Sequence, residues 1–258
     1  MNTTESAQDL DEQADPDGAQ ATGLAHRASH SHAIARMAES NILAPAQLER
    51  RRLIHRDESV RPLSDAFREI RTRLLGMADG QNFVTLLVAV SPRCGSSFVA
   101  RNLAAAFAFD ESKTSLLIDC NLRYPGQHKA LEVDPVSGGL IDFLEAPERG
   151  IGSMIYPTGI PRMRLIPAGK ARENGGEYFS STPMRAALES LRNRYADRYI
   201  FLDGPAIAGS PDARILSDLA DFVVVVAGYG RDTPKAISQA TANFDPGKLA
   251  GVVFNHAP

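Results

Sequence analysis

Short apolar runs alternate along this chain with segments whose apolar residues are spaced for helices. Five runs have the length and composition of buried parallel strands, and they occupy residues 84–90, 114–119, 199–203, 222–227 and 249–254. A shorter run predicts a strand at 163–167, and helical patterns fall at 99–107, 140–144 and 183–195. Strands and helices that alternate at this spacing predict an α/β fold with a doubly wound, mostly parallel sheet.

The first eighty residues follow a different pattern. Residues 1–45 are polar and poor in large apolar side chains, which predicts a disordered tail. Residues 46–80 form a second unit, with a short basic helix predicted at 46–55 and a clearer helix at 63–75. Residues 81–258 then make up the predicted α/β domain.

The predicted helix at 63–75 has two different faces. Its apolar side chains recur at helical spacing and predict a stripe that packs on the domain; they are Leu63, Phe67, Ile70 and Leu74. Asp65, Arg68 and Arg71 recur at every third position outside this stripe. They fit either a solvated face with one i,i+3 ion pair or a surface that contacts another protein chain.

Composition restricts the class of protein. The 258-residue chain has a formal net charge of −3, which argues against a broad nucleic-acid-binding surface. Its two cysteines, Cys94 and Cys120, lack the spacing of a zinc site and suit a reducing compartment. No apolar run reaches the ~20 residues of a membrane helix, and the N-terminus lacks the apolar core of a signal peptide. We therefore expect a cytoplasmic protein that reaches a membrane only through a partner.

A tight turn, SPRCGSS at 91–97, joins the first predicted strand to the helix that follows it. P-loop nucleotide-binding proteins use a turn at this place to present backbone N–H groups to phosphate. Of the pattern G-x-x-x-x-G-K-[ST], only Gly95 and Ser97 match, and Ser96 stands where the phosphate-binding lysine belongs. An ordinary strand-to-helix turn explains these residues equally well, because such turns are common in α/β domains.

Two acidic residues end predicted strands near this turn. Asp119 closes the strand at 114–119, and Asp203 closes the strand at 199–203. Ligands of doubly wound sheets bind beyond the carboxyl ends of the strands, where a phosphate loop needs carboxylates to hold Mg²⁺. Ser97, Asp119 and Asp203 are therefore the candidate metal ligands, although each carboxylate alone would also fit a turn or a helix cap.

Further motifs follow one another in fixed order between residues 61 and 255. They are SDAFREIR at 64–71, GSSFVARNLA at 95–104, LLIDCNLRYP at 116–125, IPAG at 166–169, FLDGPAIAGSPD at 201–212 and GVVFN at 251–255. In this order they resemble the cytosolic domain of bacterial tyrosine kinases of capsule and exopolysaccharide systems. That family lies in the MinD/ParA-like branch of P-loop ATPases, and its exopolysaccharide-locus tyrosine autokinases are the members that the chain resembles most.

The resemblance implies a P-loop fold of the MinD/ParA-like type and assigns roles to particular positions. The positions of the nucleotide site and its neighbours are Arg93, Cys94, Gly95, Ser96, Ser97 and Arg123. Asp119 and Asp203 match the catalytic acids that hold Mg²⁺. Asp65, Arg68 and Arg71 match the family's E-x-x-R-x-x-R helix, through which subunits contact each other, with Asp in place of Glu.

The departures from the family pattern concentrate where the chemistry takes place. Ser96 replaces the lysine that neutralises phosphate charge, Arg93 replaces a loop glycine, and Asn121 replaces the second acid of a D-x-D motif. The tyrosine-rich tail that the family autophosphorylates has no counterpart in this sequence. Since phosphoryl transfer depends on positioning and electrostatics, we expect binding of ATP and Mg²⁺ to be weak or absent, and no tyrosine autophosphorylation.

These observations predict a degenerate, catalytically inactive relative of the kinases. The resemblance implies a role in exopolysaccharide, capsule or holdfast biosynthesis and export. The protein would act as a cytoplasmic, oligomeric partner of a membrane copolymerase or chain-length protein, at the inner face of the membrane.

Two alternatives stay open. In the first, the protein is an active ATPase or tyrosine kinase in which Arg93 supplies the missing charge. In the second, it is a MinD/ParA-like positioning protein, although Ser91 stands at the place of that group's signature lysine.

Overall fold

The computed structural model describes residues 42–55, 57 and 60–255 of the chain. The predictions made for residues 1–41 and 256–258 lie outside these described residues. The helices are α2 (Pro45–Arg50), α3 (Arg61–Met77), α4 (Ser96–Ala108), α5 (Gln127–Ala130), α6 (Leu140–Glu145), α7 (Gly176–Phe179), α8 (Thr182–Asn193), α9 (Asp212–Ser217) and α10 (Pro234–Thr241). The strands are β1 (Val84–Ala89), β2 (Thr114–Asp119), β3 (Tyr156–Pro157), β4 (Met163–Ile166), β5 (Arg198–Asp203), β6 (Phe222–Gly228) and β7 (Leu249–Asn255). Two short 3₁₀ helices, Pro147–Arg149 and Ile151–Met154, link α6 to β3.

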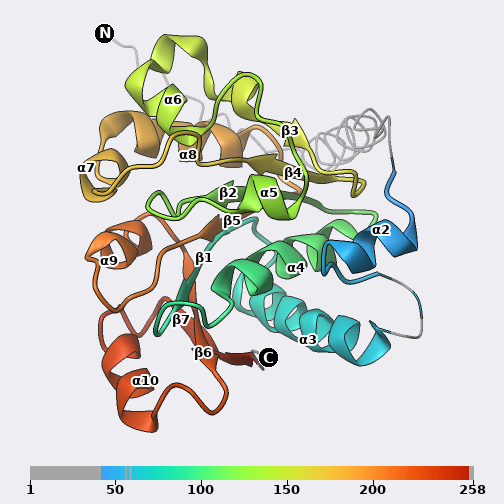
Figure 1. Ribbon diagram of the computed structural model, residues 1–258, viewed down its shortest axis with the longest axis vertical. Helices are drawn as coiled ribbons and strands as arrows, with labels where there is room; N and C mark the ends of the chain where they lie inside the picture. The colour runs from blue at the N-terminus through green and yellow to red at the C-terminus, as the bar shows by residue number, and fades with distance from the viewer. Residues whose placement is uncertain (1–41, 56, 58–59, 256–258) are drawn as a thin grey trace, which may run out of the picture.

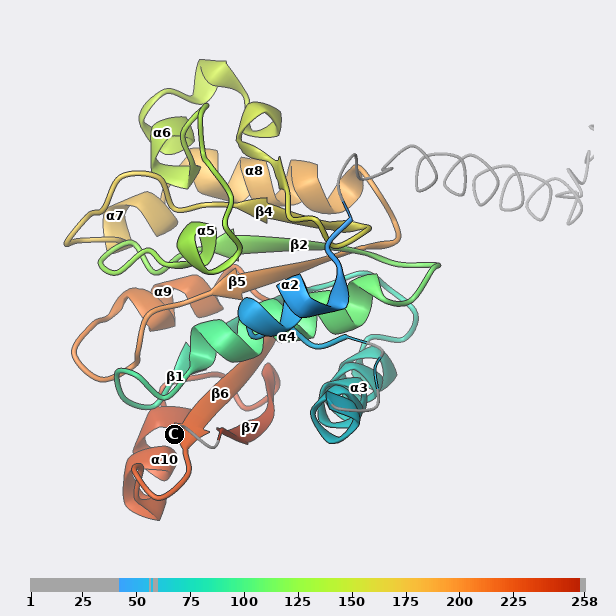
Figure 2. The ribbon, with the colours of Figure 1, turned by 45° about the vertical axis from the view of Figure 1, so that its right-hand side comes forward.

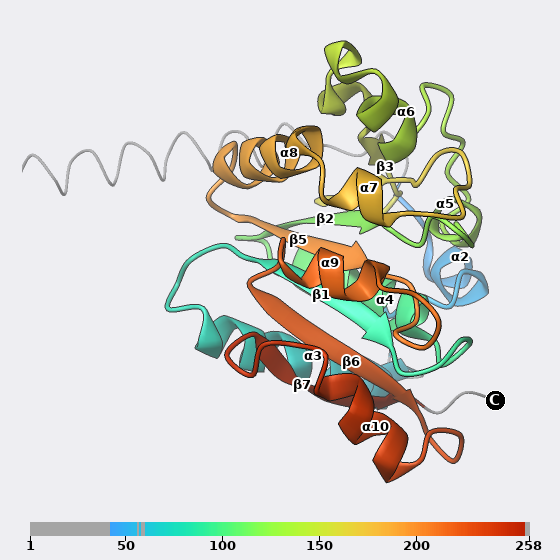
Figure 3. The ribbon, with the colours of Figure 1, turned by 90° about the vertical axis from the view of Figure 1, so that its left-hand side faces the viewer.

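Within this part of the chain, the seven strands form one sheet in the order β3-β4-β2-β5-β1-β6-β7 (Figure 1). Every neighbouring pair is parallel except β3 and β4, which are antiparallel. The prediction of a doubly wound, mostly parallel sheet is therefore confirmed. Because the parallel strands share one direction, their carboxyl ends meet at one edge, as the arrowheads in Figure 3 show.

Helices cover both faces of the sheet (Figures 1 and 2). One apolar core lies between the sheet and α2, α3 and α4, where Leu87, Leu117 and Phe201 project from three strands. The other core lies between the opposite face and helices α6 to α10, where Leu86 and Leu202 project. Alternating strand residues thus point into two different cores, which explains why the strands read as continuous apolar runs.

Helix α4 is the helix that positions the candidate phosphate loop. Ten of its thirteen residues are buried. The carbonyl oxygens at its C-terminal end accept side-chain hydrogen bonds: Arg71 donates to Ala106, and Arg162 donates to Ala108. Near its middle, the amide of Asn102 accepts from the Ile54 N–H at 2.7 Å and donates to the Arg52 carbonyl at 3.0 Å. These contacts hold α4 between the sheet and the N-terminal helices.

The predicted helix at 63–75 exists as the longer α3, but two of its predicted side-chain positions differ. Phe67 and Leu74 are buried as expected, whereas the Leu63 side chain at the start of the helix is exposed. Arg71 does not lie on an accessible ridge, because its Nη1 donates to the Ala106 carbonyl of α4 at 2.9 Å. The sequence pattern cannot show this bond, since the acceptor belongs to a backbone 35 residues away.

The described structure begins at residue 42, inside the segment that the sequence predicted to be a tail. Leu43 is buried, and its N–H donates to the Gly159 carbonyl at 3.0 Å. Helix α2 begins at Pro45 and ends at Arg50, so it is shorter than the predicted helix at 46–55. Across the described residues, no helix has both the length and the apolar character needed to cross a membrane.

Candidate functional site

The loop between β1 and α4 has the backbone shape of a phosphate loop. Gly95 is the N-cap of α4, with φ of 84°, and Arg93 has φ of 66°. A side chain at Gly95 would collide with the amide of Asn255, which donates to the Cys94 carbonyl at 3.0 Å. Glycine is therefore required at position 95, whereas Arg93 adopts a left-handed conformation that arginine rarely takes.

A cavity of about 690 Å³ opens in front of this loop at the carboxyl edge of the sheet. Its lining comes from three segments that follow β1, β2 and β5, at residues 92–97, 121–124 and 205–212. The place agrees with the general rule for doubly wound sheets. Most predicted cofactor positions line this cavity, namely Arg93, Gly95, Ser96, Ser97 and Arg123. Cys94 is the exception, because its side chain is fully buried and turns toward Asp232.

The two predicted acids lie side by side behind the loop. Asp119 and Asp203 are register partners at the ends of β2 and β5, and both are buried. Asp119 accepts backbone hydrogen bonds from Asn121, Gly126 and Gln127. The sequence prediction that these carboxyls converge at one edge of the sheet agrees with this geometry.

Gln127 joins the acids to the loop, and sequence reasoning did not identify it. Its Nε2 donates to Asp203 Oδ2 at 2.7 Å and to the Ser97 carbonyl at 2.9 Å, while its N–H donates to Asp119 Oδ2. The side chain is fully buried. Its position after a Pro-Gly pair indicates only a turn, so nothing in the local sequence indicates contact with both acids.

The acid pair retains protons more strongly than ordinary aspartates. Burial raises the pKa of Asp119, although three backbone hydrogen bonds oppose the rise. Burial and the nearby Asp119 carboxylate raise the pKa of Asp203, against the effects of Gln127, Ser97 and Arg101. Two close carboxylates in a medium of low polarity cannot both ionise without a large loss of free energy. The buried Oδ1 of Asp203 and Oε1 of Gln127 have no hydrogen-bond partner among the described residues, so a proton or a cation would satisfy them.

None of the basic groups around the cavity stands at the position of the missing lysine. Ser96 is buried at the position where an ammonium group would reach bound phosphates. Arg123 is held by Glu173, with its Nε 3.2 Å from Glu173 Oε2 and its Nη2 donating to the Glu173 carbonyl. Arg93 is exposed at the rim, and its side chain makes no hydrogen bond or ion pair to the residues that the structure describes.

These residues fit the parts of Mg-ATP unequally. The amides of residues 93–97 have no acceptor within the described part of the chain, which suits a phosphate group. Hydroxyl and carboxyl oxygens near Ser97 are suitable for Mg²⁺ by type. The fixed cation on the phosphates is absent, because a serine occupies position 96. The loop therefore offers backbone donors for a phosphate group without the lysine of a P-loop kinase.

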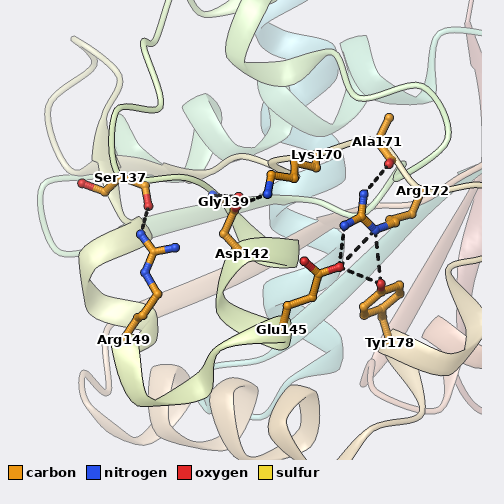
Figure 4. Close-up of polar contacts among 9 residues, drawn as sticks. All are labelled: Ser137, Gly139, Asp142, Glu145, Arg149, Lys170, Ala171, Arg172 and Tyr178. Atoms are coloured by element: carbon orange, nitrogen blue, oxygen red, sulfur yellow. Dashed lines mark hydrogen bonds and ion pairs between the residues drawn. The ribbon is translucent and has the colours of Figure 1, made fainter.

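One wall of the cavity is fixed by a polar cluster on α6 and α7 (Figure 4). Glu145 accepts hydrogen bonds from Arg172 and from the Tyr178 hydroxyl at 2.9 Å. The Arg172 N–H in turn donates to the carbonyl of Leu122, which lines the cavity. Beside this cluster, Asp142 accepts from the Gly139 N–H and lies 3.8 Å from the Lys170 ammonium. The segment after β4 is therefore joined to α6 through Lys170 and Arg172, and to the cavity lining through the bond from Arg172 to Leu122.

The turn between β6 and α10 contacts the outer side of the phosphate loop. Asp232 accepts from the Ser91 hydroxyl at 2.6 Å and from the Cys94 thiol at 3.0 Å. Burial alone would raise its pKa, but hydrogen bonds from Cys94, Ser91 and the Gly228 N–H, with the charge of Arg231, lower it. Neither Arg231 nor Asp232 was identified from the sequence, because they lie about 140 residues from the loop.

Comparisons with known proteins place the chain in a family. No protein-family model matches the sequence. The chain is similar to the tyrosine-protein kinase Wzc of Salmonella typhimurium, with 34% identity over 194 residues that cover 74% of this chain and 26% of that protein. It is also similar to the succinoglycan biosynthesis transport protein ExoP of Rhizobium meliloti, with 30% identity over 190 residues that cover 69% of this chain and 23% of that protein. The chain thus spans about a quarter of the length of these curated relatives.

Solved structures agree with the sequence comparison. The BceF tyrosine kinase domain superposes with a TM-score of 0.67 at 29% identity, over 83% of this chain and 87% of that chain. The kinase domain of Escherichia coli ETK gives a TM-score of 0.68 at 25% identity, over 75% of each chain. The cell division ATPase MinD of Pyrococcus furiosus shares the fold, with a TM-score of 0.54 at 20% identity over 66% of this chain and 70% of that chain. In sequence and in fold, the chain belongs to the bacterial tyrosine kinase family of exopolysaccharide and capsule systems, as a kinase-type domain of the MinD/ParA-like P-loop class.

Proposed function

We propose that the protein is a catalytically inactive component of a bacterial exopolysaccharide, capsule or holdfast system. In this proposal it acts in the cytoplasm, at the inner face of the membrane, with a membrane copolymerase or chain-length protein. The printed names of the relatives support the kind of system, since they include a tyrosine-protein kinase and a succinoglycan transport protein. The observation that carries the loss of activity is the serine at position 96 in a loop whose backbone is otherwise formed.

The electrostatics of the cavity support this proposal. Transfer of a phosphoryl group depends on fixed positive charge near the β- and γ-phosphates, and the loss of one such group lowers rates by orders of magnitude. Here the position nearest to the phosphates carries only a hydroxyl, and Arg123 is already paired with Glu173. The raised pKa values of Asp119 and Asp203 mean that the pair holds less negative charge for a metal than two ordinary aspartates would.

One observation favours an active ATPase or tyrosine kinase as the second candidate. Arg93 lines the cavity, and its side chain has no partner among the described residues, so it is available to a ligand. It keeps a left-handed backbone, which arginine adopts only at a cost in free energy. A positioning protein of the MinD/ParA type is supported by the fold alone.

Nucleotide binding separates these candidates. We expect calorimetric titration of the wild-type protein with Mg-ATP to give no binding in the micromolar range, because no ammonium group meets the phosphates. A Kd near 1 μM, about −8 kcal/mol, would contradict the inactive reading. In that case Arg93→Ala identifies the cause, because loss of binding in this variant would show that Arg93 supplies the cation. Lys129→Ala removes a positive charge outside the cavity lining and serves as the control.

The acid pair predicts a stability that depends on pH. A carboxyl whose pKa is raised by folding takes up a proton when the chain folds, so its contribution to stability is complete at low pH. That contribution is lost as the pH rises from the ordinary aspartate range near ~4 through the raised pKa. Asp203→Asn cannot ionise, so its free energy of unfolding relative to the wild type should improve between pH 5 and pH 8.

The expected improvement is about 1.4 kcal/mol for each pH unit between pH 5 and the raised pKa of Asp203. Denaturant unfolding at both pH values measures it, and Asp218→Asn on the exposed end of α9 serves as the control. A difference between Asp203→Asn and wild type that is the same at pH 5 and pH 8 would show that Asp203 is ionised throughout this range.

The exposed part of α3 supports the proposed contact with another chain. Arg68 has 60% of its side chain exposed and pairs with Asp65 at 3.0 Å on the same helix. Such an exposed pair contributes only ~0–1 kcal/mol to stability. Both charges therefore stay available to a neighbouring subunit or to the partner, where arginine can bind a carboxylate through two hydrogen bonds.

We expect Arg68→Ala to reduce self-association, or association with the cytoplasmic tail of the copolymerase, while the melting temperature changes little. Arg73→Ala is the matched control, because Arg73 is 76% exposed and pairs with Glu69 in the same way. Arg71→Ala should instead lower the free energy of unfolding by ~1–3 kcal/mol, since the Ala106 carbonyl loses its donor. Light scattering and thermal melts measure both effects, and equal assembly of Arg68→Ala and Arg73→Ala would remove α3 from the interface.

A further inference from the structure

The dipeptide Arg231–Asp232, in the turn between β6 and α10, makes an unusual number of contacts with the phosphate loop. The Arg231 guanidinium donates from Nη1 to the Arg93 carbonyl at 2.9 Å and from Nη2 to the Pro92 carbonyl at 3.2 Å. With the Asn255 amide on the Cys94 carbonyl, three consecutive loop carbonyls each accept from a side chain outside the loop. We call Arg231 and Asp232 the latch.

The second half of the latch is the Asp232 carboxylate. Its Oδ1 accepts from Ser91 Oγ, and its Oδ2 accepts from Cys94 Sγ and from the Gly228 N–H at 2.8 Å. Ser91 Oγ and Cys94 Sγ are also 3.1 Å apart, so the two side chains and the carboxylate form one connected group. The carboxylate thereby joins the start of the loop, at Ser91, to its middle, at Cys94.

These contacts act on two features of the phosphate loop. One is the left-handed backbone of Arg93, and the other is the set of free amides at residues 93–97. Arg93 is held in the left-handed region because the carbonyls on both sides of its N–Cα–C unit, those of Pro92 and Arg93, are bound by one guanidinium. With these carbonyls bound by the turn and by β7, the amides of residues 93–97 keep no protein acceptor among the described residues. The loop thus has the donor arrangement of an anion site before any anion arrives.

We propose that Arg231 and Asp232 are positioning residues that hold the phosphate loop in its binding shape without nucleotide. The proposal extends the function proposed above: an inactive domain whose loop is held by its own side chains presents the same surface to its partner whether or not ATP is present. The contacts of Asp232 are partly buried, whereas those of Arg231 lie at the surface. Their loss would remove the groups that hold the loop carbonyls and side chains in place.

The two cysteines of the chain provide a direct test. Cys94 is fully buried under the latch, and Cys120 is fully buried in the core between the sheet and α6 to α10. Burial also raises the pKa of the Cys120 thiol, which makes it slow to react. Alkylation with a maleimide, followed by peptide mass spectrometry, reports loop opening at Cys94 and global unfolding at Cys120 in the same sample.

In the wild-type protein we expect both thiols to react slowly, at a rate that millimolar Mg-ATP does not change. The double variant Arg231→Ala with Asp232→Asn should react at Cys94 at least tenfold faster, with the Cys120 rate unchanged. Lys235→Ala, on the exposed start of α10, is the control and should behave as wild type. Asp232→Glu, which keeps the carboxylate, should restore part of the protection relative to Asp232→Asn.

Two results would overturn the proposal: a Cys94 rate in the double variant equal to that of wild type, or rapid reaction of Cys94 in the wild type itself. If both thiols become reactive in the double variant, the whole fold has opened. The single variant Arg231→Ala is then tested in its place, and a faster rate at Cys94 with an unchanged rate at Cys120 is again the expected result. The comparison of the variants with the wild type is made without nucleotide and without the polysaccharide system. A finding that the protein binds ATP would therefore refute the proposed inactivity. The proposal about Arg231 and Asp232 would still be decided by the thiol rates of the variants.

Discussion

The packing of α4 between the sheet and α3 is the constraint on which the rest of the structure depends. Because this helix is buried over most of its length, its direction is set by the two layers that enclose it. Its N-terminus then has to lie at the carboxyl edge of β1, beside the ends of β2 and β5. Arg71 and Arg162 satisfy carbonyls at the opposite end of the helix. Apolar packing therefore places the N-terminus of α4 where a phosphate loop needs it, and this placement does not require the lysine that gives such loops their chemistry.

The position of the loop and its positive charge depend on different residues, which explains how the chain keeps the fold of a kinase without the phosphate-binding lysine. Ser96 lies at the start of α4 and lines the cavity, whereas the packing of α4 rests on the apolar residues along the rest of the helix. The buried acids accept hydrogen bonds from Gln127 and from backbone N–H groups, and burial raises their pKa. The outer side of the loop is bound by Arg231 and Asp232. Side chains and backbone groups of the protein itself thus contact the loop from both its inner and its outer side.

The sequence predicted the parts of this structure that depend on local pattern. Continuous apolar runs identified the central strands, and Asp119 and Asp203 converge because parallel strands end at one edge. The antiparallel β3 and the helices α5, α7, α9 and α10 were not predicted, because none of these segments has a clear apolar run or a clear helical spacing of apolar residues. Contacts between residues that are far apart in the sequence could not be predicted either. The sequence pattern placed Arg71 on the surface, whereas the structure shows its bond to α4. No sequence signal links Asp232 to Ser91. Side-chain partners of this kind are determined by the tertiary fold.

The central claim is that the loop is formed and lacks only its cation, and restoring that cation tests it most directly. Calorimetric titration of Ser96→Lys with Mg-ATP should show binding at least tenfold tighter than the wild type, about 1.4 kcal/mol, because the new ammonium enters a cavity whose backbone donors are already in place. Ser210→Lys places the same charge elsewhere on the cavity lining and should not produce this gain. If Ser96→Lys binds no better than wild type, or if Ser210→Lys gains equally, the loop does not have the geometry of a phosphate site and the account fails.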